Sequence, residues 1–587
     1  MSPARLSSFL ALALLPLIFD MRCADPITAP KLCCWLAAAG LAALNPYRPW
    51  TAAEKALALW FGWSVLSALA NGFLPAWPSL LTVLAALIWS RSEMPQRNLW
   101  LATGFGLTVS YSWLQRLGLD PFTWSDPHLS RLRTIAGLGN PNYLAMYLAC
   151  LFPWAWDLLY RRGWPGWLIA FFSMIGLLLT ATRGSNLVVT AVFVVACLDS
   201  LVRLRRLSRF WLVGGLLLAL AWGASLWSSG RRQFALASTM VSLGSGHDYS
   251  VSARKLLWVS AWRHGLEHPL LGVGPGHFGD AYLLNRDLEP DVLMKRSRRP
   301  EDPHNEPLRV LSETGWIGLL LWSAWLMLGL RAQWRQPGPQ LAGLLVLLGN
   351  SLTNCFTPAV WPLLILWTTP DRRDSEARIR WAGLPILLIG VSAGLAGWLV
   401  ERTFWWDDEW KFRAQAVPGE RGFWAEQRLR ALETCSLHCP PWLLEALVLR
   451  KCLVWQDIAE LTGQPLAWKK AEAFARMRID LDPDNAYYWR FLAHIYEREN
   501  LLAQALETWK EAQRRDPLSP AIAFFMAQVQ HSRGDTAAAL KSLERSLELF
   551  SKSRQVYLFR AQIMIEQGRT WEGIEDWVES QVIDEGI

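Results

Sequence analysis

The feature that most restricts the fold of this chain is a series of about thirteen apolar runs before residue 401. Most are long enough, or nearly so, to cross the hydrocarbon core of a membrane, which takes about 20 helical residues. The first run lacks a small-residue cleavage site and is expected to stay in the protein. The runs are at residues 6–20, 31–45, 54–71, 73–90, 98–115, 141–160, 164–181, 185–202, 210–228, 307–330, 340–356, 358–369 and 381–400.

The composition agrees with many membrane crossings. Hydrophobic residues make up 52% of the 587 residues and charged residues only 18%, compared with about a quarter in soluble proteins. The chain also has 37 tryptophans, and tryptophan concentrates where a membrane meets water. We therefore predict an all-α protein whose residues 1–400 form a polytopic transmembrane helical bundle of about 12–13 spans.

The basic residues indicate which connections lie inside. Alternate connections carry arginine and lysine, whereas the turns "NGFLPAWP" and "NCFTPAV" carry no charge. Because cytoplasmic loops hold the excess of Lys and Arg, the N-terminus is predicted to be inside, with a large loop (229–306) and everything after residue 400 outside. In a bacterium this describes a multi-pass inner-membrane protein with a periplasmic outer face. The basic residues concerned are Arg48, Lys55, Arg91, Arg97, Arg161, Arg162, Arg203, Arg205, Arg206, Arg209, Arg331, Arg335, Arg372, Arg373, Arg378 and Arg380.

Some basic residues and histidines fall on the predicted outer side. Two interpretations are open: polar residues simply collect in loops, or a cationic, imidazole-rich surface receives an anionic substrate. The net charge of +8 does not predict nucleic acid binding, because the arginines lie in short clusters between apolar runs. The outer-side residues are Arg131, Arg133, Arg183, His128, His247, His264, His268, His277 and His304.

From about residue 452 the sequence repeats with a period of 34 residues. Small residues recur in fixed columns, and Asp482-Pro483 and Asp516-Pro517 are one period apart. The pattern resembles tetratricopeptide repeats, three to four of them over residues 452–585, forming an α-solenoid that offers a concave face to a protein partner. Residues 401–451 are then a helical linker. The columns are Ala459, Ala493, Ala527 and Ala561; Ala471, Ala505 and Ala539; and Asn500, Gly534 and Gly568.

Two cysteines of the predicted linker, Cys435 and Cys439, lie close together in "CSLHC". Two interpretations are open for them: a disulfide formed in an oxidising periplasm, or a pair of packing thiols. Their spacing differs from the C-x-x-C-H pattern of haem attachment.

The segment "EDPHNEPLRVLSETGWIGLLLW" (301–322) places polar groups directly before and inside an apolar run, where they are costly and usually functional. His304-Asn305, nine residues, Gly315 and Gly318 follow the pattern H-N-x9-G-x-x-G. This pattern resembles the signature of O-antigen ligases and of the related bacterial O-oligosaccharyltransferases and O-antigen polymerases. Further segments agree in order: "GLGNPNYLA" (137–145), "TATRGSN" (180–186) and "SARKLLWVSAWRHGLEHPLLGVGPGHF" (252–278).

The resemblance implies a glycosyltransferase of lipopolysaccharide biosynthesis. Such enzymes take a glycan from an undecaprenyl-diphosphate carrier at the periplasmic face and pass it to an acceptor hydroxyl, without a metal or cofactor. Ligases, oligosaccharyltransferases and polymerases share this donor and differ in the acceptor, which is lipid A core, protein or another glycan; the sequence leaves the acceptor open. A transporter would place ionisable residues near mid-bilayer, where almost none is seen, and a membrane scaffold would leave the motif residues without a role.

Arginine and histidine side chains suit such a reaction. Arg183, between two spans, is predicted to grip a diphosphate bidentately; the alternative is an anchor whose head reaches the interface. Arg254, which precedes an amphipathic helix and matches a family arginine, is a second candidate, and Arg133 with Arg131 a third. His304 is predicted to be the general base, because imidazole exchanges a proton near neutral pH; the alternative is a histidine of a polar loop.

The residues around His304 refine this hypothesis. Asp302-Pro303 is expected to supply the N-cap and first residue of a helix, whose positive end favours an anion and disfavours imidazolium. A later start, at Glu306-Pro307, is the alternative. Asn305 is assigned to the substrate site by the motif. Glu313 is predicted to pair with Arg309 at i,i+4 or to orient a neighbour.

Three further signals have a structural alternative. Asn140 and Asn142, in "GNPN", either cap the following span or contact the sugar. "GVGPGH" (272–277) superficially resembles a phosphate loop, but no strand precedes it, and a turn is predicted instead. His264 and His268 have the i,i+4 spacing of zinc ligands, against which the metal-free chemistry of the family argues.

Overall fold

The computed structural model describes most of the chain, and the described residues form helices and turns without a β-strand. They divide into two compact units, residues Met1–Gly276 with Asp302–Trp405, and residues His277–Glu301 with Trp406–Ile587. The described residues are 2–23, 25–44, 49–72, 75–122, 134–162, 176–177, 180, 182, 185, 188–191, 249–285, 300, 302–335, 338–369, 383–416, 418–551 and 553–582.

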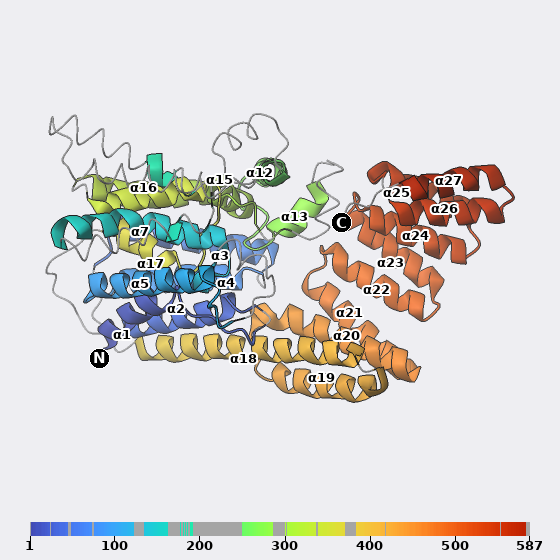
Figure 1. The fold of residues 1–587 in the computed structure, drawn as a ribbon, viewed down its shortest axis with the longest axis horizontal. Helices are drawn as coiled ribbons and strands as arrows, with labels where there is room; N and C mark the ends of the chain where they lie inside the picture. Colours follow the sequence, from blue (N-terminus) through green and yellow to red (C-terminus); the bar gives the residue numbers. More distant parts are fainter. Residues whose placement is uncertain are drawn as a thin grey trace. The chain divides into compact units, whose positions relative to one another are not determined.

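The long helices of the first unit run side by side, and α12 lies across them, seen end-on in Figure 1. Helix α18 continues from this unit into the second. The elements are α1 (Pro3–Phe9), η1 (Leu10–Leu14), α2 (Thr28–Ala43), α3 (Ala52–Asn71), α4 (Trp77–Ser90), α5 (Arg97–Arg116), η2 (Ala136–Leu138), α7 (Pro141–Arg162), α12 (Tyr249–Glu267), α15 (Glu306–Trp334), α16 (Pro339–Ser351), α17 (Trp361–Thr368) and α18 (Gly383–Ala416).

Each predicted run within the described residues corresponds to a helix, although fewer of these helices qualify as membrane spans. By length and composition, two described helices suit a membrane crossing, Glu306–Trp334 and Leu387–Gln415. Pro3–Leu14, Thr28–Ala43 and Trp77–Ser90 are apolar but shorter. The predicted runs 164–181, 185–202 and 210–228 fall largely or wholly outside the described residues. The count of 12–13 spans therefore stays a prediction.

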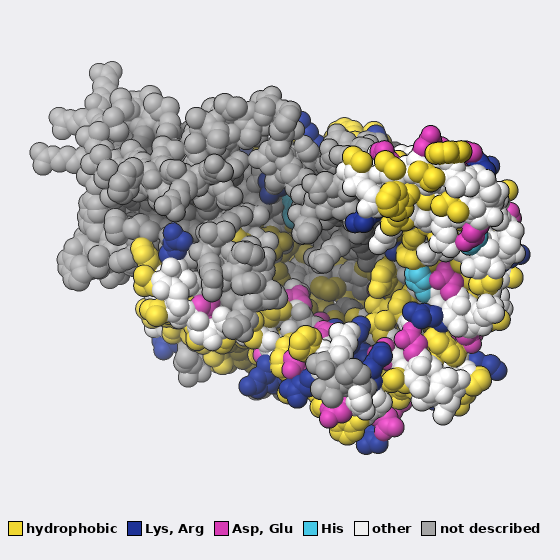
Figure 2. Space-filling model, turned by 45° about the vertical axis from the view of Figure 1, so that its right-hand side comes forward, with side chains coloured by type: hydrophobic (Ala, Val, Ile, Leu, Met, Phe, Trp, Pro, Cys, Tyr) yellow, Lys and Arg dark blue, Asp and Glu magenta, His cyan; other side chains and the backbone are white. Residues whose placement is uncertain are grey.

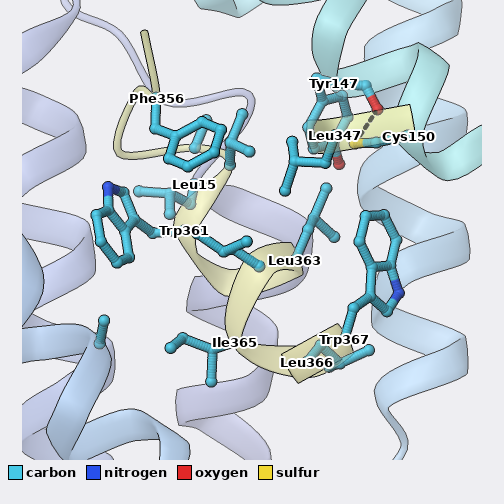
Figure 3. Close-up of a cluster of buried hydrophobic side chains, with 14 of the residues drawn as sticks. Leu15, Tyr147, Cys150, Leu347, Phe356, Trp361, Leu363, Ile365, Leu366 and Trp367 are labelled. Carbon is cyan, nitrogen blue, oxygen red and sulfur yellow. Dashed lines mark hydrogen bonds between the residues drawn. The ribbon is translucent and has the colours of Figure 1, made fainter. Parts of the chain in front are cut away.

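The core of the first unit is built around α17, whose eight residues are all buried (Figure 3). The indole of Trp361 stacks on those of Trp60 and Trp325, with ring centroids 6.3 and 5.8 Å apart. In a bundle that lies in lipid, such a core is stabilised by close packing and by the stacked rings rather than by transfer from water. A helix too short to span a bilayer is thus held by packing on every side.

Connections that the charge pattern assigns to the outer side contact one another. The Asn71 side-chain amide donates to the Gly272 carbonyl at 3.4 Å, and the backbone N–H of Asp25 donates to Glu401 Oε2 at 3.1 Å. On the predicted inner side, the Arg91 guanidinium lies 4.5 Å from the centre of the Trp50 ring. These contacts agree with a bundle whose odd and even connections lie on opposite sides.

The second unit is a series of helical hairpins. Packing between consecutive helices is extensive for α20 with α21, α22 with α23, α24 with α25, and α26 with α27. The elements are α13 (Phe278–Asn285), η3 (Pro418–Glu420), α19 (Arg421–Ser436), η4 (Pro441–Leu443), α20 (Leu444–Thr462), α21 (Pro465–Leu481), α22 (Ala486–Arg498), α23 (Leu502–Arg515), α24 (Pro520–Ser532), α25 (Thr536–Leu549), α26 (Arg554–Glu566) and α27 (Thr570–Val582).

The hairpins have the predicted period. Helices α22, α24 and α26 begin at residues 486, 520 and 554, and α23, α25 and α27 begin at 502, 536 and 570, each 34 residues after the last. The column alanines are at most 3% exposed, so paired helices approach closely, and the turn residues Asn500, Gly534 and Gly568 have φ of 60°, 84° and 79°. The prediction of tetratricopeptide-like repeats is confirmed. The first hairpin begins at Leu444, before the predicted boundary at 452.

The surface of these repeats mixes hydrophobic side chains with acidic and basic ones (Figure 2). Exposed apolar residues include Trp571, Ile574 and Trp577 of α27. Tryptophan is among the residues enriched in protein interfaces. The predicted protein partner of the repeats stays a prediction.

The predicted linker is helical and is tied to the first hairpin by buried charges. Arg428 of α19 donates to Asp407 at 2.7 Å and to Asp457 of α20 at 2.6 Å. The nearby pair of cysteines, Cys435 and Cys439, is not joined by a disulfide in this described segment. Burial raises the pKa of the Cys439 thiol to about 12, which keeps it protonated and unreactive at neutral pH.

Candidate functional site

The helix that follows the H-N pair begins later than predicted. Asn305 is the N-cap of α15: its Oδ1 accepts the N–H of Leu308 at 3.0 Å, and its Nδ2 donates to the Leu352 carbonyl at 2.9 Å. The prediction that Asp302-Pro303 supplies the cap and first helical residue is wrong. Asn305 is the cap because its side-chain amide accepts a hydrogen bond from the helix end and donates another to the carbonyl of a distant loop.

His304 directly precedes this cap and has a positive φ of 51°. Its backbone N–H donates to Asp302 Oδ1 at 2.7 Å, its ring Nδ1 lies 3.3 Å from the same oxygen, and its side chain is 35% exposed. The carboxylate thus lies beside Nδ1, and in the tautomer with the proton on Nδ1 the lone pair of the neutral imidazole is on Nε2. Asp302 is therefore placed to orient the ring, a position that the sequence did not suggest.

A buried ionic cluster occupies the first turns of α15. Arg309 contacts Glu306 at 2.5 Å through Nη2 and Glu313 at 3.2 Å through Nη1. Glu306 also accepts the N–H of Phe356 at 3.0 Å, and Glu313 accepts the N–H of Gly276 at 3.1 Å. The predicted Arg309–Glu313 pair is present, while Glu306 was missed despite its i,i+3 spacing. Because two carboxylates neutralise Arg309, the cluster positions loops rather than attracting an anion.

The glycine that follows the H-N pair after nine residues is required by the local backbone. Gly315 interrupts α15 with φ 69° and ψ −173°, and the N–H of Trp316 donates to the Pro269 carbonyl at 2.8 Å. A Cβ at Gly315 would lie 2.3 Å from the Leu270 carbonyl oxygen. Only glycine permits both this φ and this approach.

The "GVGPGH" segment packs on this kink. Val273 N–H donates to the Ser312 carbonyl at 2.8 Å, and Gly274 N–H donates to the Glu313 carbonyl at 3.0 Å. A Cβ at Gly272 would lie 2.4 Å from the backbone of Glu313. The segment is thus a turn, as predicted, and it packs on α15.

The two histidines with zinc-like spacing have different surroundings. His264 is buried, with Nδ1 2.8 Å from the Ser312 hydroxyl and Nε2 3.3 Å from that of Ser260; it joins α12 to α15. His268 is exposed. Arg254 lies within α12, so the prediction that it precedes the helix is wrong.

The "GNPN" and "TATRGSN" segments are brought together. Asn140 Oδ1 accepts the N–H of Asn142 at 2.8 Å at the start of α7, which is the capping role, and the Thr182 hydroxyl lies 3.4 Å from Asn142 Oδ1. The Ser185 hydroxyl donates to Asn350 of α16 at 2.5 Å. Arg183, between these two residues, lies outside the described residues.

Arg131 and Arg133 also lie outside the described residues. No structural test therefore applies to the predicted anion-binding roles of these two arginines or of Arg183.

These contacts bring together polar groups from segments far apart in sequence, which we call the polar layer. It comprises the Asn142–Thr182 contact, the Ser185–Asn350 hydrogen bond and, two residues beyond Asn350, the hydrogen bond from Asn305 to the Leu352 carbonyl. One buried side chain outside this layer was missed altogether: Lys31 donates to the carbonyls of Leu15, Pro16 and Ile18 at 2.8–3.2 Å. A single lysine in an apolar run was its only sequence signal.

Residues 168–323 match the O-antigen ligase family. The chain therefore contains a domain of the O-antigen ligase superfamily. The matched stretch includes Arg183, Arg254, His304, Asn305 and Glu313. No curated protein is detectably similar in sequence to the chain.

Solved structures of MamA resemble part of the chain. The "Crystal structure of MamA" has 13% sequence identity, covers 28% of this chain and 91% of its own, and gives a TM-score of 0.24. "MamA 41-end from Desulfovibrio magneticus RS-1" has 10% identity, covers 30% and 94%, and gives 0.24. Scores this low assign no fold, so the repeat assignment rests on the 34-residue helix period.

Proposed function

We propose that the protein transfers a glycan from an undecaprenyl-diphosphate carrier to an acceptor hydroxyl at the periplasmic face of the bacterial inner membrane. The single observation that supports this most is in the polar layer: Asn305 of the H-N motif and Ser185, two residues after Arg183, bond to positions 352 and 350 of the same segment. The family match over residues 168–323 covers both motifs.

In this proposal His304 acts as the general base. Nε2 takes the proton of the acceptor hydroxyl while the acceptor oxygen attacks the anomeric carbon of the donor sugar. The bond from that carbon to the diphosphate oxygen breaks, and the lipid diphosphate leaves with the electron pair. Asp302 holds the ring so that Nε2 carries the lone pair, and base catalysis of this kind contributes about 10²–10⁴-fold to the rate.

Arginines supply the charge that the leaving diphosphate needs. Arg183 and Arg254 are the proposed clamps, with Arg133 a further contact; a guanidinium offers paired donors to phosphate oxygens. Asn305 and Glu313 act in this scheme through position: the first fixes the start of α15, and the second fixes Gly276.

Three candidate activities share this donor chemistry and differ only in the acceptor. Lipid A core would make the protein an O-antigen ligase, protein hydroxyls an oligosaccharyltransferase, and a second glycan a polymerase. The repeats are consistent with a protein acceptor, because a solenoid offers a concave surface that can bind a polypeptide. They suit an assembly partner equally well.

Glycan transfer by the purified protein tests the proposal, with Arg183→Ala as the informative variant. We expect the wild type to move a labelled glycan from a lipid-diphosphate donor to one of three separately supplied acceptors. Arg183→Ala should lower the initial rate about 10²–10³-fold, since it removes a donor to the developing charge. The rate of Arg183→Lys should lie between those of the wild type and Arg183→Ala, because lysine keeps the positive charge but loses the paired N–H donors of the guanidinium.

The matched control is Arg331→Ala, an exposed arginine at the far end of α15, which should transfer normally. Wild-type rates for Arg183→Ala would remove the clamp from the account, and no labelled acceptor with the wild type would remove the proposed activity.

A further inference from the structure

The outward face of α12 is apolar although it is exposed. Val259, Trp262 and Leu266, together with Leu270 just beyond the helix, are 42–63% exposed. The opposite face packs on α15, where the His264 ring contacts Ser312. Spacings of three and four residues place the exposed side chains on one helix face. Lys255 lies on the same face, one turn earlier, and is also exposed.

This face continues a second exposed stripe, on α15. The ring of Trp262 meets that of Trp316 edge to face, with centroids 5.4 Å apart. Beyond Trp316, α15 exposes Leu320, Met327 and Trp334, each 64–67% exposed. The two stripes therefore form one apolar surface, which follows α15 and continues onto α12.

The length of α15 beyond its kink identifies what covers that surface. Residues 316 to 334 rise about 28 Å at 1.5 Å per residue, close to the hydrocarbon thickness of about 30 Å. Tryptophans stand at both ends, as at membrane–water interfaces, and Arg331 and Arg335 mark the inner end by the charge rule. Trp316 thus lies at the outer boundary of the bilayer, and Trp262 lies beside it.

We propose that α12 is an interfacial helix: Val259, Trp262, Leu266 and Leu270 enter the outer-leaflet surface of the bilayer, and Lys255 faces lipid phosphates. Helices with one apolar face bind at this depth, with the apolar side chains about 5–10 Å into the headgroup boundary. The occupant is lipid rather than a second protein copy, because the face is continuous with a stripe of membrane-crossing length. The proposal does not depend on glycan transfer.

The consequence concerns the site. Helix α12 packs on the segment of α15 before the kink: the His264 ring contacts Ser312, and Gly265 packs on Leu311. If α12 lies at the level of the lipid headgroups, it holds residues 304–313 just outside the hydrocarbon core, at the depth of a lipid-linked diphosphate.

Spin-label accessibility tests this directly. Nitroxides are attached to Leu266→Cys, Leu320→Cys and Leu466→Cys in the full-length protein, reconstituted in nanodiscs of neutral and anionic phospholipid. Leu320 is the bilayer reference. Leu466 of α21 is the aqueous reference, since its 62% exposure matches the 58% of Leu266. The parent chain, treated alike, gives the background from native cysteines.

We expect the label at 266 to relax with oxygen more than with a water-soluble nickel chelate, giving a ratio between those of positions 320 and 466. A ratio equal to that of position 466 would overturn the proposal by placing the face in water. Low accessibility to both reagents would overturn it too, because protein would then cover the face. All three substituted residues are exposed, so folding of the variants is not at issue.

Discussion

His304→Ala is expected to abolish glycan transfer while expression, insertion and stability stay near wild type. Its ring is 35% exposed and contacts Asp302, so little packing is lost when it is removed. The proposed loss is that of the group that takes the acceptor proton, a contribution of about 10²–10⁴-fold. The initial rate of transfer from a labelled lipid-diphosphate glycan measures it.

Two variants separate chemistry from position. His268→Ala removes an exposed histidine of the predicted outer face and should leave the rate unchanged. Asp302→Asn keeps the ring but weakens its orientation, so the rate should fall by less than in His304→Ala. Normal transfer by His304→Ala would rule out the base assignment, whatever the two controls do.

Arg309→Met is expected to be the most destabilising single change at the site. It removes the cation between Glu306 and Glu313, whose side chains are 0% and 5% exposed. Removing one partner of a buried ion pair costs about 3–5 kcal/mol, because it leaves uncompensated charge in a low dielectric. Thermal unfolding in detergent should show a clearly lower midpoint.

The reverse change tests the cause. Adding Glu306→Gln and Glu313→Gln to Arg309→Met removes the uncompensated charges and should restore part of the lost stability. Arg331→Met, on the same helix but exposed, should unfold like the wild type. An Arg309→Met protein as stable as the wild type would show that the cluster is not a structural anchor.

The tail was predictable because its signal is local and repeated. A 34-residue period fixes both helices of each hairpin, and the buried column alanines follow from it. The boundary was less predictable: α18 runs unbroken to Ala416, and the first hairpin starts at Leu444. Apolar periodicity does not mark where a helix leaves a membrane if the helix itself continues.

Local pairs within the site could be predicted from the sequence, but contacts between distant segments could not. The Arg309–Glu313 pair follows from i,i+4 spacing, but the cap was not predicted: Asp302 and Glu306 each directly precede a proline, whereas the cap is Asn305. The hydrogen bond from Asn305 to the Leu352 carbonyl, 47 residues away, fixes this choice. The kink at Gly315 likewise depends on Pro269 and Leu270, which no local pattern connects to it.

The measurement that tests the central claim most directly is the side of the membrane on which position 304 lies. In intact spheroplasts, His304→Cys should react with a membrane-impermeant maleimide, as should Leu437→Cys, which is 80% exposed in the second unit. Arg331→Cys should react only after permeabilisation, and the parent chain gives the background. Labelling of position 304 only after permeabilisation would place the imidazole in the cytoplasm and contradict transfer at the outer face.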